Sequence, residues 1–536
     1  MMATKGQRRL LAGRRRGPAI ATAAALLSGL GVCAVQAQQA APPTTTPRSW
    51  TIEPTLLVRS VASDDARLDG SGKKDISYEL VPSLALRSRG PRHHLDAKVG
   101  VDHVAYTKDA YPKRTDPLVD VSLNTVLVPN ALSLDTAATA ERRASTPFGS
   151  QDANTDVNQQ VRTQTWRLSP SFQVAPREGV RASVRSDNTW IRRFGEGVNA
   201  LGGNVDKVYS RNTLAKLERE PRPLGVGLEL SDQAVDYNDQ SDALRLQDAL
   251  LSVGYAVDPQ FTVYLLGGRE RSRFSSVPNG SPTTHTDSDT GLRVRWAPLE
   301  RSTLTAEARK RFFGNSYKVQ WDHRSPFLGL RLAAAREPLI APDSLRFTGD
   351  IRGQFDAIFQ SRGFDPAQRE ALVRSALIAY GLPDSINSPA NVYVNRAQLA
   401  STANAEVALM GRRTTLVLSA YTRKQEQLHL EGEPAVSVFD QGDLKQTGAQ
   451  SALSFRLTPR VSLDAAYRYD RTQGVGLTNA SQLTKERVTT VGTGLALSPR
   501  TRVGLALQYQ ELDTTVGGRP PSTQATSATV TLFHRF

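Results

Sequence analysis

The chain of 536 residues has a single cysteine, Cys33, and few apolar residues for its length. Hydrophobic residues make up 39% of it, whereas ordinary globular domains have roughly 45–50%. A soluble chain of this length needs several apolar cores, and a disordered chain has no reason for a regular pattern. Here the apolar residues alternate with polar ones along most of the chain, which predicts strands that are apolar on one face only.

Long apolar runs and metal-binding motifs are also missing. After residue 37 there is no apolar run of about 18 residues, so no membrane-spanning helix is expected. The seven histidines match no metal-ligand spacing, and there is no G-x-S-x-G elbow or phosphate-binding loop. We therefore expect no metal, no cofactor and no enzyme. An outer-membrane enzyme using Ser, His and Asp residues at a barrel rim is the third and least favoured reading.

Acidic residues are absent from MMATKGQRRLLAGRRRG, which contains six basic residues, so the net charge of +15 falls to +15 − 6 = +9 without it. The apolar run PAIATAAALLSGLGVCAV and the exit V-Q-A follow. This order predicts a signal peptide over 1–37 that is cleaved after Ala37, with an uncleaved anchor as the alternative. A Pro/Thr-rich linker over 38–49 comes next. The remaining basic residues form no cluster, so no nucleic-acid partner is expected.

From residue 50 onward the chain repeats an alternating run and a connection. Examples of the runs are RVSLDAAYRYDR, TRVGLALQYQE and GLRVRWAP. Short turns such as VDPQFT, LTPRVS and LSPRTRV alternate with long polar loops at 145–160, 274–289, 427–445 and 512–524. A soluble sandwich has no reason for that alternation, whereas a transmembrane barrel places all short turns on one side. The pattern predicts an all-β, antiparallel up-and-down barrel over 50–536 with about 22 strands, within a range of about 18–22.

The chain ends in the alternating stretch TSATVTLFHRF. Phe536, Leu532 and Val530 share one face of this predicted strand. A closed barrel pairs its last strand with its first, because an open edge in lipid leaves backbone groups without partners. A terminal Phe on such a strand also resembles the assembly signal of Gram-negative outer-membrane barrels, although His534 stands where an aromatic or aliphatic residue is commoner.

An insertion over 338–391 breaks the repeat and is far longer than an ordinary loop. Its stretch FDPAQREALVRSALIAYGLP carries helix start and stop signals and an apolar stripe, so it predicts one amphipathic helix. The residues concerned are Asp365, Pro366, Val373, Leu377, Tyr380 and Gly381. Three placements are open: a plug in the lumen, a lid over the mouth, or an external docking element. Lumen or mouth is favoured, because the apolar face must be covered.

Charged residues alternate with the apolar face and are expected to line the lumen. The candidates are Arg167, Arg185, Asp187, Arg293, Arg295, Glu307, Arg309, Asp464, Arg468 and Asp470. One interpretation is structural, because opposite charges on neighbouring strands satisfy each other around a wet interior. The other is a basic, mixed-charge pore that favours anionic or sugar solutes. The two interpretations are compatible, and the structural one is favoured.

Four stretches resemble the outer-membrane barrels associated with PEP-CTERM/exosortase and exopolysaccharide loci. They are WTIEPTLLVRS, ERRASTPFGSQ, DAIFQSRGFDPAQREALVRSALIAYGLPDSINSPANVYVNRAQL and the terminal strand. The resemblance spans nearly the whole chain after residue 37 and is most specific in the insertion. It implies an envelope location and a link to polysaccharide export. It implies no catalytic residues, because that family has no established activity.

These observations predict an outer-membrane barrel, reached after Sec-type export in a Gram-negative bacterium, that acts as a channel or exit port. The competing prediction is a non-conducting structural barrel whose loops bind surface polysaccharide or a partner protein. The expected partners are outer-membrane lipid, the barrel-assembly machinery, and anionic polysaccharide or small solutes.

Overall fold

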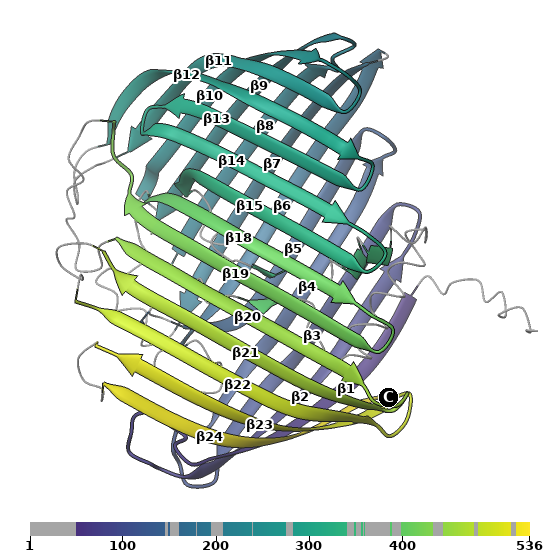
Figure 1. The fold of residues 1–536 in the computed structure, drawn as a ribbon, viewed down its shortest axis with the longest axis vertical. Coiled ribbons are helices and arrows are strands. Elements are labelled where there is room, and N and C mark those ends of the chain that lie inside the picture. The colour runs from purple at the N-terminus through teal and green to yellow at the C-terminus, as the bar shows by residue number, and fades with distance from the viewer. Residues whose placement is uncertain are drawn as a thin grey trace, which may run out of the picture. The chain divides into compact units, whose positions relative to one another are not determined.

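Twenty-two antiparallel strands form the fold of the described chain, which was obtained as a computed structural model (Figure 1). Two further strands, β16 (Thr348–Gly349) and β17 (Ile386–Asn387), pair with each other. The bounds of the large sheet are β1 Trp50–Ser63, β2 Asp75–Arg89, β3 His93–Tyr106, β4 Arg114–Val128, β5 Leu132–Ala144, β6 Gln160–Arg177, β7 Val180–Phe194, β8 Lys207–Arg219, β9 Leu224–Tyr237, β10 Gln240–Ala256, β11 Phe261–Phe274, β12 Thr283–Leu299, β13 Ser302–Arg311, β14 Gly314–Arg324, β15 Leu328–Leu339, β18 Gln398–Met410, β19 Thr414–Gln427, β20 Leu444–Arg456, β21 Val461–Gly474, β22 Leu483–Ala496, β23 Thr501–Thr514 and β24 Ser522–Arg535.

The structure describes residues 50–536 except for fourteen short ranges. These are 145–147, 151–159, 178, 195–206, 238–239, 275–281, 340–347, 350–354, 357, 360–385, 388–397, 432–442, 476–480 and 516–520. The chain divides into two units, residues 1–48 and 49–536. The predicted signal peptide, its cleavage after Ala37 and the linker 38–49 lie outside the described residues. Within those residues, no helix is long and apolar enough to cross a membrane.

Each strand pairs with its neighbours in sequence, and the last strand returns to the first. In this closing pair, Thr55 of β1 lies opposite Arg535 of β24, and Ser63 lies opposite Ser527. The terminal residue takes part, because the backbone N–H of Phe536 donates a 3.0 Å hydrogen bond to the carbonyl of Pro54. The predicted closed antiparallel barrel of about 22 strands is therefore confirmed, and it leaves no edge strand unpaired.

The connections separate the two ends of the barrel. At one end of the barrel every connection has two to four residues. These are the connections that leave an even-numbered strand from β2 to β14, and the three that follow β18, β20 and β22. We call this end the short-turn end; the other end, with loops such as 145–159 and 428–443, is the long-loop end. The alternation predicted from the sequence is not strict, because only two positions separate β9 from β10 and β13 from β14 at the long-loop end. The predicted loops 274–289 and 512–524 shrink to 275–282 and 515–521, because strands continue into them.

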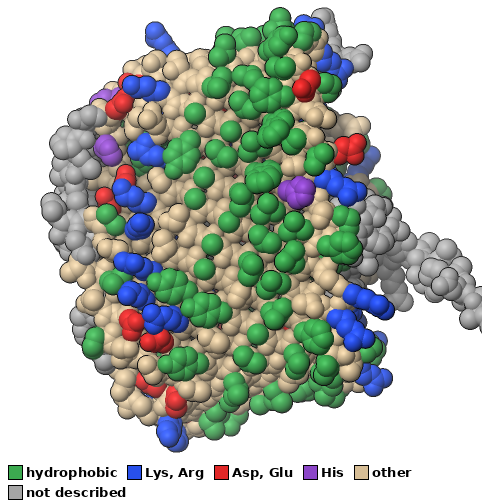
Figure 2. Space-filling view, in the orientation of Figure 1, with side chains coloured by type: hydrophobic (Ala, Val, Ile, Leu, Met, Phe, Trp, Pro, Cys, Tyr) green, Lys and Arg blue, Asp and Glu red, His purple; other side chains and the backbone are tan. Residues whose placement is uncertain are grey.

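The outer surface carries an apolar belt. In β21 the side chains of Leu463 and Tyr467 are 45% and 42% exposed, whereas Ser462, before them, and Asp470, after them, are buried on the other face. The predicted face of β24 also points outward, with Val530, Leu532 and Phe536 all exposed. Figure 2 shows apolar side chains over the middle of the barrel wall and charged ones toward the two ends of the strands. This distribution matches a wall that contacts lipid.

All five tryptophans (Trp50, Trp166, Trp190, Trp296 and Trp321) are exposed. Trp50, Trp296 and Trp321 lie near the short-turn ends of their strands, whereas Trp166 and Trp190 are paired neighbours nearer the long-loop end. Tryptophan prefers the boundary between hydrocarbon and water, so two levels of tryptophan are the arrangement of a membrane-spanning barrel.

The insertion between β15 and β18 is described only in part. Pro338 and Leu339, the first residues of the predicted range 338–391, belong to β15 and pair with β18. Backbone pairing of β16 with β17 brings residues 348 and 387 together. Residues 355, 356, 358 and 359 are helical. The helix predicted from Asp365 to Gly381 lies outside the described residues.

Candidate functional site: the barrel lumen

The ten predicted lumen residues all lie on inward-facing positions of their strands. In β12, Arg293 and Arg295 alternate with the exposed outward side chains of Leu292 and Trp296. In β6, Arg167 stands between the outward Trp166 and Leu168. The same alternation places the remaining seven candidates on the inner wall, because side chains in a strand point to opposite faces in turn. The lumen wall is therefore polar and charged.

The structure joins these residues into separate groups rather than into one site. Arg293 Nε lies 2.6 Å from Glu307 Oε2, and Arg309 Nη1 lies 3.6 Å from Glu307 Oε1. Arg468 Nε lies 3.1 Å from Asp470 Oδ2. Three further ion pairs and hydrogen bonds are Arg185 to Asp187 at 3.0 Å, Arg185 to Asp135 at 2.9 Å, and Ser462 Oγ to Asp464 at 3.0 Å. Most predicted charges therefore have an opposite charge nearby, either on the same strand, as in Arg185–Asp187 and Arg468–Asp470, or on another strand, as in Arg293–Glu307.

Arg309 and Arg311 anchor the most buried ion-pair network, and its acids were not predicted from the sequence. Arg309 forms ion pairs with Asp248 and Asp289, and Arg311 forms one with Glu270. The side chains of Asp289 and Glu270 have no exposed surface. Breaking a buried ion pair leaves an uncompensated charge, so this network holds β10 to β13 together. Alternation alone could have placed these acids inward, but not beside a particular arginine.

Three residues between β5 and β6, 148–150, contact the inner wall of the barrel. The hydroxyl of Ser150 donates a 2.7 Å hydrogen bond to Glu486 Oε1 and accepts one of 3.1 Å from Gln510 Nε2. Thr484 Oγ1 donates a 2.9 Å hydrogen bond to the carbonyl of Phe148. These partners lie on the inner face of β22 and β23, which are seven and six strands away from β5 around the closed barrel. Residues 148–150, which we call the docked segment, are therefore fixed against another part of the inner wall.

A second loop also turns inward at the long-loop end. Leu68, in the connection 64–74, is fully buried against Leu512 and Ala525, which point inward from β23 and β24. The loop is tied internally, because Asp65 accepts a 2.9 Å hydrogen bond from the backbone N–H of Gly70. Partial burial raises the pKa of Asp69, but hydrogen bonds from Ser71 outweigh this, and the net shift is downward.

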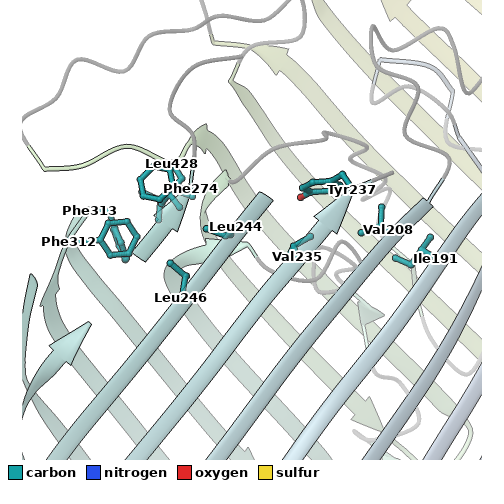
Figure 3. Close-up of a cluster of buried hydrophobic side chains, with 11 residues drawn as sticks. Ile191, Val208, Val235, Tyr237, Leu244, Leu246, Phe274, Phe312, Phe313 and Leu428 are labelled. Carbon is teal, nitrogen blue, oxygen red and sulfur yellow. The ribbon is translucent and has the colours of Figure 1, made fainter. Parts of the chain in front are cut away.

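An apolar cluster covers the inner rim of the long-loop end (Figure 3). Val235, Leu244 and Phe274 point inward from β9, β10 and β11 and are almost completely buried. Phe312, Phe313 and Leu428, from two connections at this end, complete the cluster, whereas Phe355, Ile358 and Phe359 of the insertion are buried separately from it. A water-filled lumen would leave inward side chains exposed, so this half of the barrel is occupied.

The exposure of inward polar side chains differs between the two halves of the barrel. Large inward polar side chains nearer the long-loop end, such as Arg423, Gln446 and Gln510, are buried. Those nearer the short-turn end are exposed; examples are Arg181, Arg185, Glu218 and Arg295. The lumen is therefore an open vestibule on the short-turn side that narrows toward the long-loop side.

A cavity of about 230 Å³ lies on the vestibule wall across β7 to β13. Tyr264 lines it, and its ring lies so close to Gly254 of β10 that a Cβ there would be 2.6 Å from the ring. Lys216 pairs with Glu229 at 2.9 Å inside this cavity. Arg295 also lines the cavity, and its side chain forms no ion pair or hydrogen bond with any described residue. A cation and an aromatic ring thus face the lumen together.

Groups of three His, Cys, Asp or Glu side chains that could hold a metal ion do not occur among the described residues. One serine–histidine pair is present, with Ser88 Oγ 2.9 Å from His93 Nε2. Ser88 is 1% exposed, so a substrate cannot reach its hydroxyl in this arrangement. Ser88 lies opposite the outward-facing Trp50, so this pair is on the outer face of the wall and not in the lumen.

Fold and lumen together define a closed 22-stranded antiparallel barrel with a polar interior. No protein-family model and no curated protein matches the chain. Among solved structures it is similar to the FrpB iron transporter from Neisseria meningitidis (F5-1 variant), at 9% identity and a TM-score of 0.48 over 90% of this chain and 82% of the transporter. It is also similar to the siderophore receptor PiuA from Acinetobacter baumannii, at 9% identity and a TM-score of 0.44 over 90% of this chain and 82% of the receptor. For the outer membrane protein opdK from Pseudomonas aeruginosa the identity is 9% and the TM-score 0.34, over 91% of this chain and 99% of opdK. At such identities the similarity is one of barrel architecture.

Proposed function

We propose that this protein is an outer-membrane channel of a Gram-negative bacterium, exported by a Sec-type route, with a lumen that is narrowed from within. The observation that carries the proposal is the closed barrel with an apolar outer belt and a charged inner wall. A barrel needs both features to span lipid while it encloses water. The docked segment and the buried insertion residues supply the narrowing. Membrane lipid and the barrel-assembly machinery are the expected partners.

We further propose that the solute is an anionic saccharide, and that the channel serves as an exit port linked to exopolysaccharide export. Two features support this choice. The vestibule cavity presents the guanidinium of Arg295 beside the ring of Tyr264, a pairing suited to a carboxylate-bearing sugar. The resemblance to barrels of PEP-CTERM and exopolysaccharide loci points to the same solute class. No enzymatic role is proposed.

A non-conducting structural barrel is the second candidate, and one observation favours it. The buried polar side chains of the long-loop half leave little room for solute unless something moves. In this case the loops would bind surface polysaccharide or a partner protein, and the lumen would serve only stability.

Recordings in planar bilayers separate the two candidates. Leu339 and Gln398 are paired in the β15–β18 ladder, so residues 340–397 can be replaced by a two-residue turn without disturbing either strand. A channel is expected to show stepwise conductance that grows on this deletion. Shortening the connection 476–480 serves as the matched control and is expected to leave conductance near the wild-type value.

Absence of conductance in both the wild type and the deletion variant would instead support the structural barrel. For the solute, alginate oligosaccharides are added to the conducting variant, with dextran oligosaccharides of equal length as the neutral control. Transient blocks by alginate but not dextran are expected. Equal blocking by both would contradict the preference for anionic sugars.

A further inference from the structure

Three arginines share the outer face of β11 at its long-loop end. Arg269, Arg271 and Arg273 are exposed, whereas the residues between them, Glu270 and Ser272, are buried on the inner face. The period of two along a strand therefore places all three guanidinium groups outside the barrel. They lie outside the lumen.

Neighbouring strands enlarge this arginine patch. The row of paired residues through Arg273 runs to Arg245 in β10, Ala234 in β9 and Arg211 in β8. Arg211 and Arg245 share one carboxylate, because both form ion pairs with Asp232, at 2.6 and 3.0 Å. Five arginines thus surround a single aspartate within three adjacent rows. The patch consists of Arg211, Arg245, Arg269, Arg271 and Arg273.

No acidic side chain neutralises the two arginines at the centre of the patch within the described residues. The side chains of Arg269 and Arg271 form no ion pair or hydrogen bond with any residue in the described part of the chain. Their partners in β12 are Ser288 and Thr286, whose hydroxyls carry no charge. Elsewhere on the outer face, Arg487 pairs with Glu511 at 2.7 Å and with Asp513 at 3.6 Å. The excess positive charge is therefore a local property of β8 to β11.

The patch lies at the boundary of the apolar belt. Leu265, on the same face of β11, is 66% exposed, and Leu251 and Leu230 are exposed on the adjacent strands. Arg269 follows Leu265 by four residues, about 13 Å along the strand. Lipid chains that contact these leucines would hold their headgroups at the level of the arginines. Guanidinium groups bind phosphate through paired N–H donors, and the adjacent hydroxyls add further donors.

We propose that the arginine patch binds the phosphate groups of an anionic lipid in the membrane leaflet at the long-loop end. The proposal rests on the membrane placement proposed above, but it does not depend on conduction. The leucines contact the acyl chains, Arg269 and Arg271 bind phosphate, and Arg211 and Arg245 contribute positive charge around it. The bound lipid would fix the depth of β8 to β11 in the membrane.

Native mass spectrometry of the full chain in detergent tests this proposal with lipid A as the probe. The double variant Arg269→Gln, Arg271→Gln is expected to bind lipid A about thirtyfold more weakly, since each basic residue near a membrane surface contributes about 1 kcal/mol. Arg487→Gln is the matched control and is expected to bind as the wild type does. Conductance is expected to stay unchanged, which keeps this test separate from that of the channel.

Two comparisons make the test specific. Dephosphorylated lipid A, which keeps the acyl chains, is expected to bind wild type as weakly as intact lipid A binds the glutamine variant. The variant Arg269→Lys, Arg271→Lys keeps the charge and is expected to recover part of the affinity. Equal binding of the two lipids, or equal affinity of the wild type and the glutamine variant, would overturn the proposal. So would a lysine variant that binds no better than the glutamine variant.

Discussion

The hydroxyl of Ser150 lies 2.7 Å from the carboxylate of Glu486, although 336 positions separate the two residues in sequence. This contact joins the β5–β6 loop to the inner face of β22. Glu486 is also held by Arg468 at 3.0 Å, so the loop is tied to the ion pairs of the wall. The contact makes an element at the long-loop end part of the lumen.

Replacing Ser150 by alanine is expected to release the docked segment. The change removes one hydrogen bond to a carboxylate and one from Gln510, and a hydrogen bond to a charged group contributes about 1.5–3 kcal/mol. The docked population should therefore fall about tenfold or more relative to the undocked one. Single-channel recordings should show larger or longer openings.

Thr490→Val is the matched control for this variant. Thr490 also points inward from β22, but it forms no hydrogen bond to the docked segment. Its conductance is expected to match that of the wild type. Unchanged openings in Ser150→Ala would mean that residues 148–150 do not narrow the pore.

Replacing Arg309 by methionine is expected to destabilise the barrel by about 3–5 kcal/mol, because it leaves Asp248 without its cation and leaves Asp289 only the more distant Arg311, at 4.0 Å. Arg167→Met is the control, since Arg167 is exposed in the lumen and has no ion pair within the described residues. Urea unfolding in lipid vesicles measures both. If the two variants lose similar stability, the Arg309 network does not carry the role assigned to it.

The two faces of β24 are expected to respond differently to charge. Val530 is 50% exposed on the outer face, so Val530→Arg places a cation in lipid and should cost up to about 2–4 kcal/mol. Thr529→Arg places the same cation on the lumen face and should be tolerated. Heat-dependent migration in gels and vesicle unfolding report the difference. Equal losses would contradict the assignment of the faces.

The barrel could be predicted from the sequence because its main signal is geometric. Residues such as Leu463 and Asp464 must point to opposite faces of a strand, whatever the neighbouring strands are. Strand ends were harder to place, because β12 continues to Thr283 through polar residues that look like a loop. Backbone pairing with β11 outweighs that local composition.

The contacts within the lumen could not be predicted in the same way. Arg293 was placed inward, but its partner Glu307 depends on the register between β12 and β13, which the turn sets. The docked segment gave only one local signal, an apolar Phe148 within a polar loop. Its partners lie more than 300 residues away, and no local pattern encodes that distance.

Ion selectivity provides the last prediction, and it concerns Arg295. This side chain is exposed in the vestibule and has no acidic partner among the described residues, so its charge acts on passing ions without local compensation. In the variant that lacks residues 340–397, Arg295→Glu is expected to shift the reversal potential in a potassium chloride gradient toward the equilibrium potential of potassium. Arg293→Gln is a weaker test, because Arg293 is already paired with Glu307 at 2.6 Å. Outward Arg487→Glu changes the total charge equally and should leave the reversal potential unchanged, since the wall separates it from the ions. If Arg295→Glu and Arg487→Glu shift the potential equally, total charge rather than the vestibule wall sets selectivity.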